Sequence, residues 1–506
     1  MDVRTPQAMI RFGLGRRGTE ALPQDPVAWL SDQIRGPDPT RLAAPSSAVS
    51  NTMPSVAPNT MPSVAPKTAP GTAPNTMSTT ELLTALSSAP SARSGSAASS
   101  TPPSPTSDAP PGMAPGTGPS SAPSTAQGLA ALRQDRLDKP PPGQSAARAL
   151  YRTQGAGHLE TALTTPAPFR ERLVWFWTNH FTISLRRGEC AALVGAFVEE
   201  AIRPHVTGRF QDMLLAVMRH PAMLLYLDNA GSVGPNSQAG QRRHLGLNEN
   251  LARECMELHT VSPAAGYTQA DVTNFAKILT GWSVERNNDP LGFRFHPAAH
   301  EPGEQTVLGN RFPDGEAGGV AALTFLASHP ATHRHLATQL VRHFVADQPP
   351  PEAVRVIEGR LRDTGGNLGA ASLALIELPA AWQPGAKLRT PTDYVVAAVR
   401  CLDLPPDNRP NMLGLVALLG QPLWTAPAPN GWPDQSADWA APEAMMRRID
   451  WANAFAGRVG QTDVAMLADA SLGALLRPET GEAIRRAGSR HDALTLLLAS
   501  PEFQRR

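Results

Sequence analysis

The composition of the chain changes abruptly after Leu42, and this change limits how much of the sequence can fold. Residues 43–142 consist largely of Pro, Ser, Ala and Thr, and the octapeptide NTMPSVAP occurs at 51–58 and again at 59–66. Proline removes backbone donors and interrupts helices, and few large apolar groups are present to offset the entropy of ordering the chain. We therefore predict a disordered linker at 43–142, a short segment at 1–42 that docks on the main domain, and a main domain at 143–506.

One stretch inside this linker has a different composition. The sequence STTELLTALSS at 78–88 predicts a short helix capped by Ser78 or Thr79. Such a helix either forms only transiently or folds on contact with a partner.

The main domain has the periodicity of helices. In FRERLVWFWTNHFTIS, Leu173, Phe176, Trp177, His180 and Phe181 recur at the spacing of one helix face. Residues 291–309 are the exception, because short alternating runs flank a Pro-Gly turn and indicate a small β-hairpin. Strands do not alternate with helices, so we predict an all-α, multihelical single domain with a small β-hairpin insertion.

The densest group of polar residues lies in GLNENLARECMELHTV at 246–261. With Asn248 as the helix N-cap, one helix face is apolar, and Glu249 and Arg253 lie four residues apart on the other, where opposite charges stabilise a helix. His259 does not fit this amphipathic pattern, because it falls on the apolar face and needs a partner for its ring N–H. The segment is therefore either a well-capped amphipathic helix or part of a functional site. The candidate catalytic residues are His180, Asp228, Glu249, Arg253, Glu254 and His259.

Charge and motif content exclude several classes of function. Lys+Arg 45 against Asp+Glu 44 leaves no basic surface for nucleic acid. The three cysteines are far apart, which argues against a disulfide framework. The N-terminus lacks the apolar h-region of a secretory signal, and no apolar run reaches the roughly 18 residues of a membrane span. The protein is expected to be cytoplasmic by default, which leaves export open.

We predict no cofactor. Gly13, Gly15 and Gly18 match G-x-G-x-x-G, but no strand precedes them, so a helix end and a turn explain them better than a dinucleotide site. Neither HExxH nor GxSxG occurs. A divalent metal held by His180 or His259 with Glu249 or Glu254 is the alternative.

Several long motifs in series resemble the bacterial domain-of-unknown-function 1800 family. They are RLVWFWTNHFTIS, HPAMLLYLDNAGSVGPN, GLNENLARECMELHTV, GYTQADVTNFAKILTGW, FHPAAHEPGEQTVLG and APNGWPD. The resemblance spans about residues 145–505, and the RFGLG sequence corresponds to the family's opening. It implies a mostly helical bacterial protein without an agreed activity, whose genes commonly neighbour a family that is similar to alkaline phosphatases and sulfatases.

Two hypotheses of function follow. In the first, the chain is a helical accessory or assembly partner, acting with the phosphatase/sulfatase-like neighbour. In the second, it is a hydrolase-like enzyme with a His/Glu/Arg site around residues 248–259, in which a buried carboxylate acts as general base and Arg253 holds an anionic group. The absence of a known catalytic motif favours the first.

Overall fold

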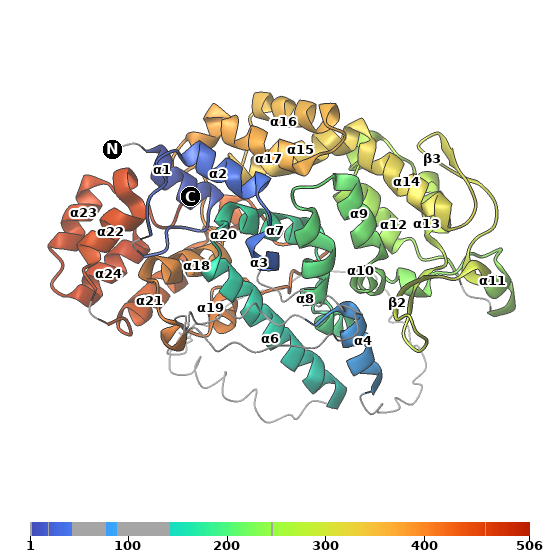
Figure 1. Cartoon of the computed structure of the whole chain (residues 1–506), viewed down its shortest axis with the longest axis horizontal. Helices are drawn as coiled ribbons and strands as arrows, with labels where there is room; N and C mark the ends of the chain where they lie inside the picture. The colour runs from blue at the N-terminus through green and yellow to red at the C-terminus, as the bar shows by residue number, and fades with distance from the viewer. Residues whose placement is uncertain (1–2, 19, 43–76, 89–141, 244–245, 461) are drawn as a thin grey trace, which may run out of the picture.

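The computed structural model describes residues 3–18, 20–42, 77–88, 142–243, 246–460 and 462–506 (Figure 1). These residues form a multihelical protein with two small antiparallel hairpins, which confirms the predicted fold class. The predicted linker at 43–142 lies outside the described residues, except for 77–88 and Pro142. In the described part of the chain, no helix has the length and apolar character needed to cross a membrane.

Helices make up most of the described chain. The N-terminal ones are α1 (Arg4–Gln7), the π-helix η1 (Ala8–Phe12), α2 (Pro26–Arg35), α3 (Pro39–Leu42) and α4 (Thr79–Ser88). Next come α6 (Pro142–Thr164), α7 (Pro168–His180), α8 (Val194–Phe197), the π-helix η3 (Val198–Ile202), α9 (Phe210–Arg219), α10 (Pro221–Tyr226), α11 (Gln238–Arg243), α12 (Asn250–Glu254), the π-helix η6 (Cys255–His259) and α13 (Gln269–Leu279). After the hairpins come α14 (Glu316–Ser328), α15 (Pro330–Phe344), α16 (Pro351–Asp363), α17 (Leu368–Glu377), α18 (Pro391–Leu402), α19 (Met412–Leu418), α20 (Ser436–Trp439), α21 (Pro442–Ala456), α22 (Val464–Leu472), α23 (Pro478–Arg485) and α24 (Arg490–Ala499).

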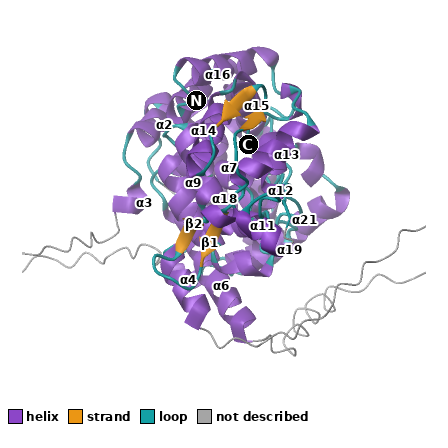
Figure 2. Ribbon diagram, turned by 90° about the vertical axis from the view of Figure 1, so that its right-hand side faces the viewer, coloured by secondary structure: helices purple, strands orange, loops and turns teal. Residues whose placement is uncertain are grey.

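The strands form two separate hairpins (Figure 2). Strand β1 (Trp282–Glu285) pairs with β2 (Gly292–Phe295), and β3 (Gln305–Val307) pairs with β4 (Asn310–Phe312). The sequence places one hairpin around Pro302 and Gly303, but the strands on either side of this turn, β2 and β3, pair with other strands. The short strand β1 is the element that the sequence pattern does not distinguish from the end of the preceding helix.

Helix α7 lies in the core because its apolar residues follow the helical repeat. Leu173 and Trp177 are buried, and the ring of Phe169 packs edge-on against that of Phe344 from α15, with a centroid distance of 5.8 Å. The ring of Phe12 from η1 stacks on Phe344 at 6.0 Å, so the N-terminal segment contributes to the same core.

The glycines of the N-terminal segment let its backbone cross closely over α18. Gly15 has a φ of 89°, and a Cβ there would lie 3.3 Å from the side chain of Ala397. Gly18 has a φ of 48°, and a Cβ there would lie 2.7 Å from Asp403. Its N–H donates to the Arg400 carbonyl at 2.9 Å. Close packing of this segment against α18 and the positive φ angles therefore account for these two glycines.

Helix α4 packs against the main domain of the same chain, where Figure 1 shows it as a blue helix beside α8. Ser78 and Glu81 form the N-terminal cap, in which Glu81 Oε2 accepts from the Ser78 N–H at 2.7 Å. Leu82 and Leu83 are buried, and the Thr79 N–H donates to Glu200 Oε1 of η3 at 2.7 Å. The cap is visible in the sequence, whereas the surface that receives the two leucines is formed by residues more than 100 positions away, which local sequence cannot reveal.

Candidate functional site

A cavity of about 480 Å³ lies between α7, α15, the start of α18 and the segment 421–438. Helix α15 contributes His335, Gln339, Arg342 and His343, whose spacing of four, seven and eight residues places them along one side of the helix. The apolar side of the same helix, with Leu336 and Leu340, is buried in the core. The polar side of α15 therefore lines a cavity, and its apolar side packs in the core.

Two sequence motifs meet at the wall of this cavity. The side chain of Asn179 in α7 donates through Nδ2 to the Trp432 carbonyl at 2.9 Å and accepts from the Trp432 N–H at 2.8 Å. Gly431, with a φ of 79°, comes so close that a Cβ there would lie 2.5 Å from the Asn179 carbonyl oxygen. This clamp fixes the loop that carries Asp434.

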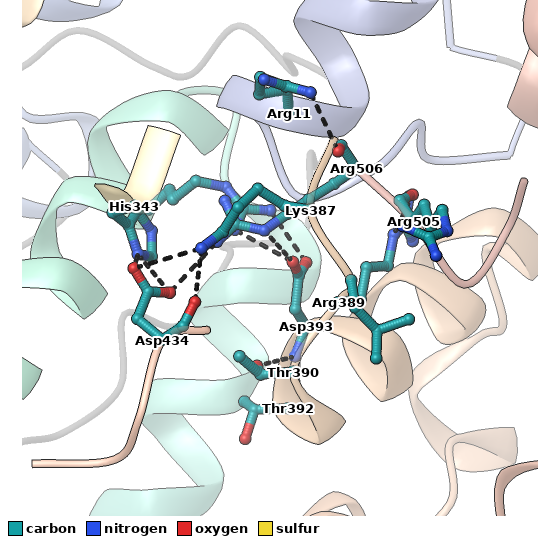
Figure 3. A network of polar contacts seen from close by, with 12 residues as sticks. Arg11, His343, Lys387, Arg389, Thr390, Thr392, Asp393, Asp434, Arg505 and Arg506 are labelled. Atoms are coloured by element: carbon teal, nitrogen blue, oxygen red, sulfur yellow. Dashed lines mark hydrogen bonds and ion pairs between the residues drawn. The ribbon is translucent and has the colours of Figure 1, made fainter. Parts of the chain in front are cut away.

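Asp434 and His343 form an acid–imidazole pair at the cavity wall (Figure 3). His343 Nδ1 lies 3.1 Å from both carboxylate oxygens of Asp434, so we assign the proton of the neutral ring to Nδ1. His343 Nε2 is buried and has no hydrogen-bond partner among the described residues. The side chain of His343 is 14% exposed and that of Asp434 is 22% exposed, and both residues line the cavity, while Nε2 itself is closed to solvent.

The environment sets the charge of each partner. Burial lowers the pKa of His343 to about 4, although the carboxylate of Asp434 opposes this shift. Burial alone would raise the pKa of Asp434, but His343, Lys387 and Arg506 outweigh it and hold this pKa well below its usual range. At neutral pH the pair is therefore a carboxylate next to a neutral imidazole.

An ionic network extends behind the pair. Arg172 donates through its two terminal nitrogens to Asp393 at 2.9 and 3.2 Å, and Arg506 Nε lies 3.2 Å from Asp393 Oδ2. Lys387 Nζ lies 2.5 Å from Asp347 Oδ1 and 3.9 Å from Asp434 Oδ2. Burial alone would raise the pKa of Asp393, but Arg172, Arg506 and Arg389 lower it to about 2. Because a buried charge is costly without a partner, this network fixes the positions of α7, α15 and α18 relative to one another.

The structure brings two of the sequence candidates, His180 and His259, close to each other, and His180 lines the cavity. The His180 ring lines it, and His180 Nε2 lies 3.2 Å from the carbonyl oxygen of His259. The His259 ring centroid is 5.8 Å from that of His180, and neither His259 ring nitrogen has a hydrogen-bond partner in the described structure. His335 joins them, with Nε2 at 2.9 Å from the Leu258 carbonyl oxygen. Burial lowers the pKa of all three rings, that of His259 to about 3, so they are neutral at pH 7.

Of the six candidates only His180 lines the cavity; His259 lies behind it, and the other four lie elsewhere. Glu249 pairs with Arg253 at 2.8 Å, as the spacing predicts, and also accepts from Gln269 and Thr273 of α13. The Glu249 hydrogen bonds, that with Thr273 first, lower its pKa. Glu254 is half-buried, and burial, together with Glu257, raises its pKa.

Asp228 forms an ion pair with Arg187 and has a φ of 60°. Helix α12 begins at Asn250, with Glu249 rather than Asn248 as its N-cap, although Asn248 Oδ1 still accepts from the Asn250 N–H at 2.9 Å. Most of the predicted apolar side is buried, namely Leu251, Ala252, Cys255, Met256 and His259, whereas Leu258 is half-buried and lines the cavity.

Sequence reasoning missed the residues of the buried network, namely Arg172, His343, Lys387, Asp393, Asp434 and Arg506. They come from distant parts of the chain, and no two of them form a motif. The available signal was APNGWPD at 428–434, which contains Asp434, together with the WTNHF motif that contains Asn179. The contact between these two motifs could not be read from either alone.

The predicted metal site, with His180 or His259 and Glu249 or Glu254 as ligands, can be compared with the geometry. Within the described ranges, no group of three or more His, Cys, Asp or Glu side chains is placed to hold a metal ion. Glu249, proposed as a ligand beside His180 or His259, bonds instead to Arg253, Gln269 and Thr273.

The fold and the site together define a multihelical protein with a polar cavity, an Asp–His pair and a buried ionic network. The sequence model of the DUF1800 family, described as a protein of unknown function, matches residues 7–505. The chain therefore belongs to this family, as its motifs indicate. No curated protein and no solved structure shows significant similarity to the chain.

Proposed function

We propose that the chain is a hydrolase-like enzyme in which His343 is the general base and Asp434 holds it in position. The observation that carries this proposal is the Asp434–His343 pair at the wall of a cavity of about 480 Å³, with His343 Nε2 free of protein partners in the described structure. Cavities of this volume hold small organic molecules.

The chemistry follows from the assigned protonation. With the Nδ1 proton directed at Asp434, a small side-chain movement must first open the buried Nε2 of His343 to the cavity. Its lone pair then accepts a proton from water while the water oxygen bonds to the electrophilic atom of the substrate. The carboxylate stabilises the imidazolium that forms, and the ring then returns this proton to the leaving group. His180 lines the same cavity and is proposed to contact the substrate. A catalytic role of Asp228, Glu249, Arg253, Glu254 or His259 stays a prediction.

A hydrolysis screen tests the proposal. The native chain, His343→Gln and Asp434→Asn are assayed with chromogenic carboxylate, phosphate and sulfate esters and with glycosides. We expect turnover of at least one class, lowered by about 10²- to 10⁴-fold in His343→Gln. His491→Gln is the control and retains full rate, because the His491 side chain is 38% exposed and does not line the cavity. Because the pKa of His343 is about 4, the rate stays constant from pH 7 to about 5 and falls below that. A native chain no faster than His343→Gln with every class of ester would refute the proposal.

A second candidate is the accessory role, as a partner of a phosphatase/sulfatase-like protein. Supporting it, Met446 and Ile449 lie three residues apart on α21 and are 55% and 38% exposed. Helix α24, which packs on α21, exposes Leu496. Apolar side chains exposed on adjacent helices are typical of interaction surfaces.

Co-purification with the phosphatase/sulfatase-like protein tests this role. The native chain is expected to retain the partner and the Met446→Lys/Ile449→Lys variant to lose it, with Arg447→Glu as a control on the same helix. Equal recovery with all three chains would count against this surface. A cytoplasmic location remains part of the proposal, supported by three cysteines that are buried and unpaired.

A further inference from the structure

The ionic network beside the cavity contains more cations than carboxylates. Its cationic side chains, each at most 2% exposed, are Arg11, Arg172, Lys387, Arg389 and Arg506. The carboxylates that face them, among the described residues, are Asp347, Asp393 and Asp434. A main-chain carboxylate at residue 506 would be a fourth and would still leave a positive excess. At the cavity wall itself the count is even, with Arg172, Arg342 and Arg506 against Asp393, Asp434 and Asp438, so missing acceptors of individual arginines, rather than net charge, indicate a place for an anion.

Two of the arginines at the cavity also have nitrogen atoms without partners. Arg506 is 1% exposed and lines the cavity, and its Nη1 has no hydrogen-bond partner in the described structure. Arg342 lines the same cavity, and its Nε is likewise buried without a partner, whereas its Nη1 donates to Gln339 at 3.0 Å. A buried donor without an acceptor costs about 1–3 kcal/mol.

The cations also disfavour one another. Burial, followed by repulsion from Arg172, lowers the pKa of Arg506 to about 10. Burial, followed by repulsion from Arg506, lowers the pKa of Arg11 to about 9. An anion beside these groups would relieve the repulsion and supply the missing acceptors.

We propose that the cavity binds the oxyanionic group of a small molecule, of the carboxylate, sulfate or phosphate type, at Arg506 and Arg342. This assignment rests on the proposed function, because it names the charged group of the substrate in the same cavity. A volume of about 480 Å³ exceeds that of a simple oxyanion, so the anionic group is one end of a larger organic molecule. The remainder of that molecule packs against Trp175, Trp424 and Trp432, which line the cavity.

Calorimetric titration of the full chain with sodium sulfate, sodium phosphate and sodium acetate tests the site, with sodium chloride at matched ionic strength as the reference. We expect saturable binding of at least one oxyanion and none of chloride. Arg342→Gln weakens this binding at least tenfold. Arg334→Gln is the matched control on the same helix, because Arg334 is 64% exposed and does not line the cavity.

The result also separates this site from the catalytic proposal. His343→Gln retains anion binding within about twofold, since neither arginine acts through the imidazole. If the native chain binds an oxyanion but hydrolyses none of the esters or glycosides, the anion site stands and the role of His343 as general base is refuted. Absence of saturable binding for all three oxyanions, or equal binding by Arg342→Gln and Arg334→Gln, would overturn the anion site.

Discussion

The polar segment at 248–259 and the ionic network around Asp393 are alike in composition and different in how they are built. Glu249 and Arg253 lie four residues apart, and their side chains are 28% and 40% exposed. Arg172 and Asp393 are 221 residues apart, and both side chains are at most 3% exposed. An exposed helical pair contributes a few tenths of a kcal/mol, whereas breaking a buried pair costs about 3–5 kcal/mol. Polar density along the sequence thus identifies the weaker of the two clusters.

Lowering the pH should reduce the free energy of unfolding more than any other change, because the buried histidines are neutral in the folded chain. Burial lowers the pKa of His158, His259 and His343 to about 4, 3 and 4 in the folded chain, below the ordinary 6.5. Between these values the unfolded chain binds more protons, so stability is fully present above pH 6.5 and is lost as the pH falls toward 4. Each histidine contributes about 1.4 kcal/mol per pH unit in this range. Urea unfolding at pH 7, 6 and 5 measures the slope, and equal stability at all three pH values would contradict the neutral buried histidines.

Asp393→Asn should produce the next largest change. The amide leaves Arg172 and Arg506 buried without their carboxylate, so the free energy of unfolding should fall by about 3–5 kcal/mol. Asp363→Asn removes an ion pair with Arg362 in which both side chains are about two-thirds exposed, and should change stability by less than about 0.5 kcal/mol. Urea denaturation at pH 7 compares the two variants, and equal losses would remove the distinction between the clusters.

Helix α4 should respond locally. Leu82→Asp places a charge on a buried position, and full burial of a leucine is worth about 1.5–3 kcal/mol, so α4 should detach. Amide hydrogen exchange is expected to accelerate in 79–88 while the unfolding midpoint of the main domain stays unchanged. Thr80→Asp adds the same charge at an exposed position of α4 and should leave the exchange as it is in the native chain. Fast exchange already in the native chain would contradict the docked helix.

Glu249→Gln should have the smallest effect. Loss of the exposed pair with Arg253 should cost about 0.2–0.5 kcal/mol and should disappear at high salt. Thermal unfolding in low and high salt measures this difference. A loss above 2 kcal/mol would place Glu249 among the residues on which the fold depends.

Local features could be predicted from the sequence, and the site could be predicted only in part. The period of 169–184 and the apolar face of 251–259 follow from residues a few positions apart, so the helices and their buried sides could be derived. The His180 side chain could be named because it falls on an apolar face, where an imidazole is unusual. Asp434 and Arg506 could not, because an isolated Asp or Arg looks like a surface residue until the fold supplies Lys387, Arg172 and His343 around it.

The contact between Arg11 and Arg506 has a consequence for protein synthesis. The guanidinium of Arg11 donates to the carbonyl of Arg506 at 3.2 Å across 495 positions of sequence. During translation the network around Arg11, Arg172 and Asp393 therefore stays incomplete until residues 501–506 have left the ribosome. Contacts that join such distant positions form slowly, so the newly made protein should pass through an open intermediate in which the charged centre is hydrated.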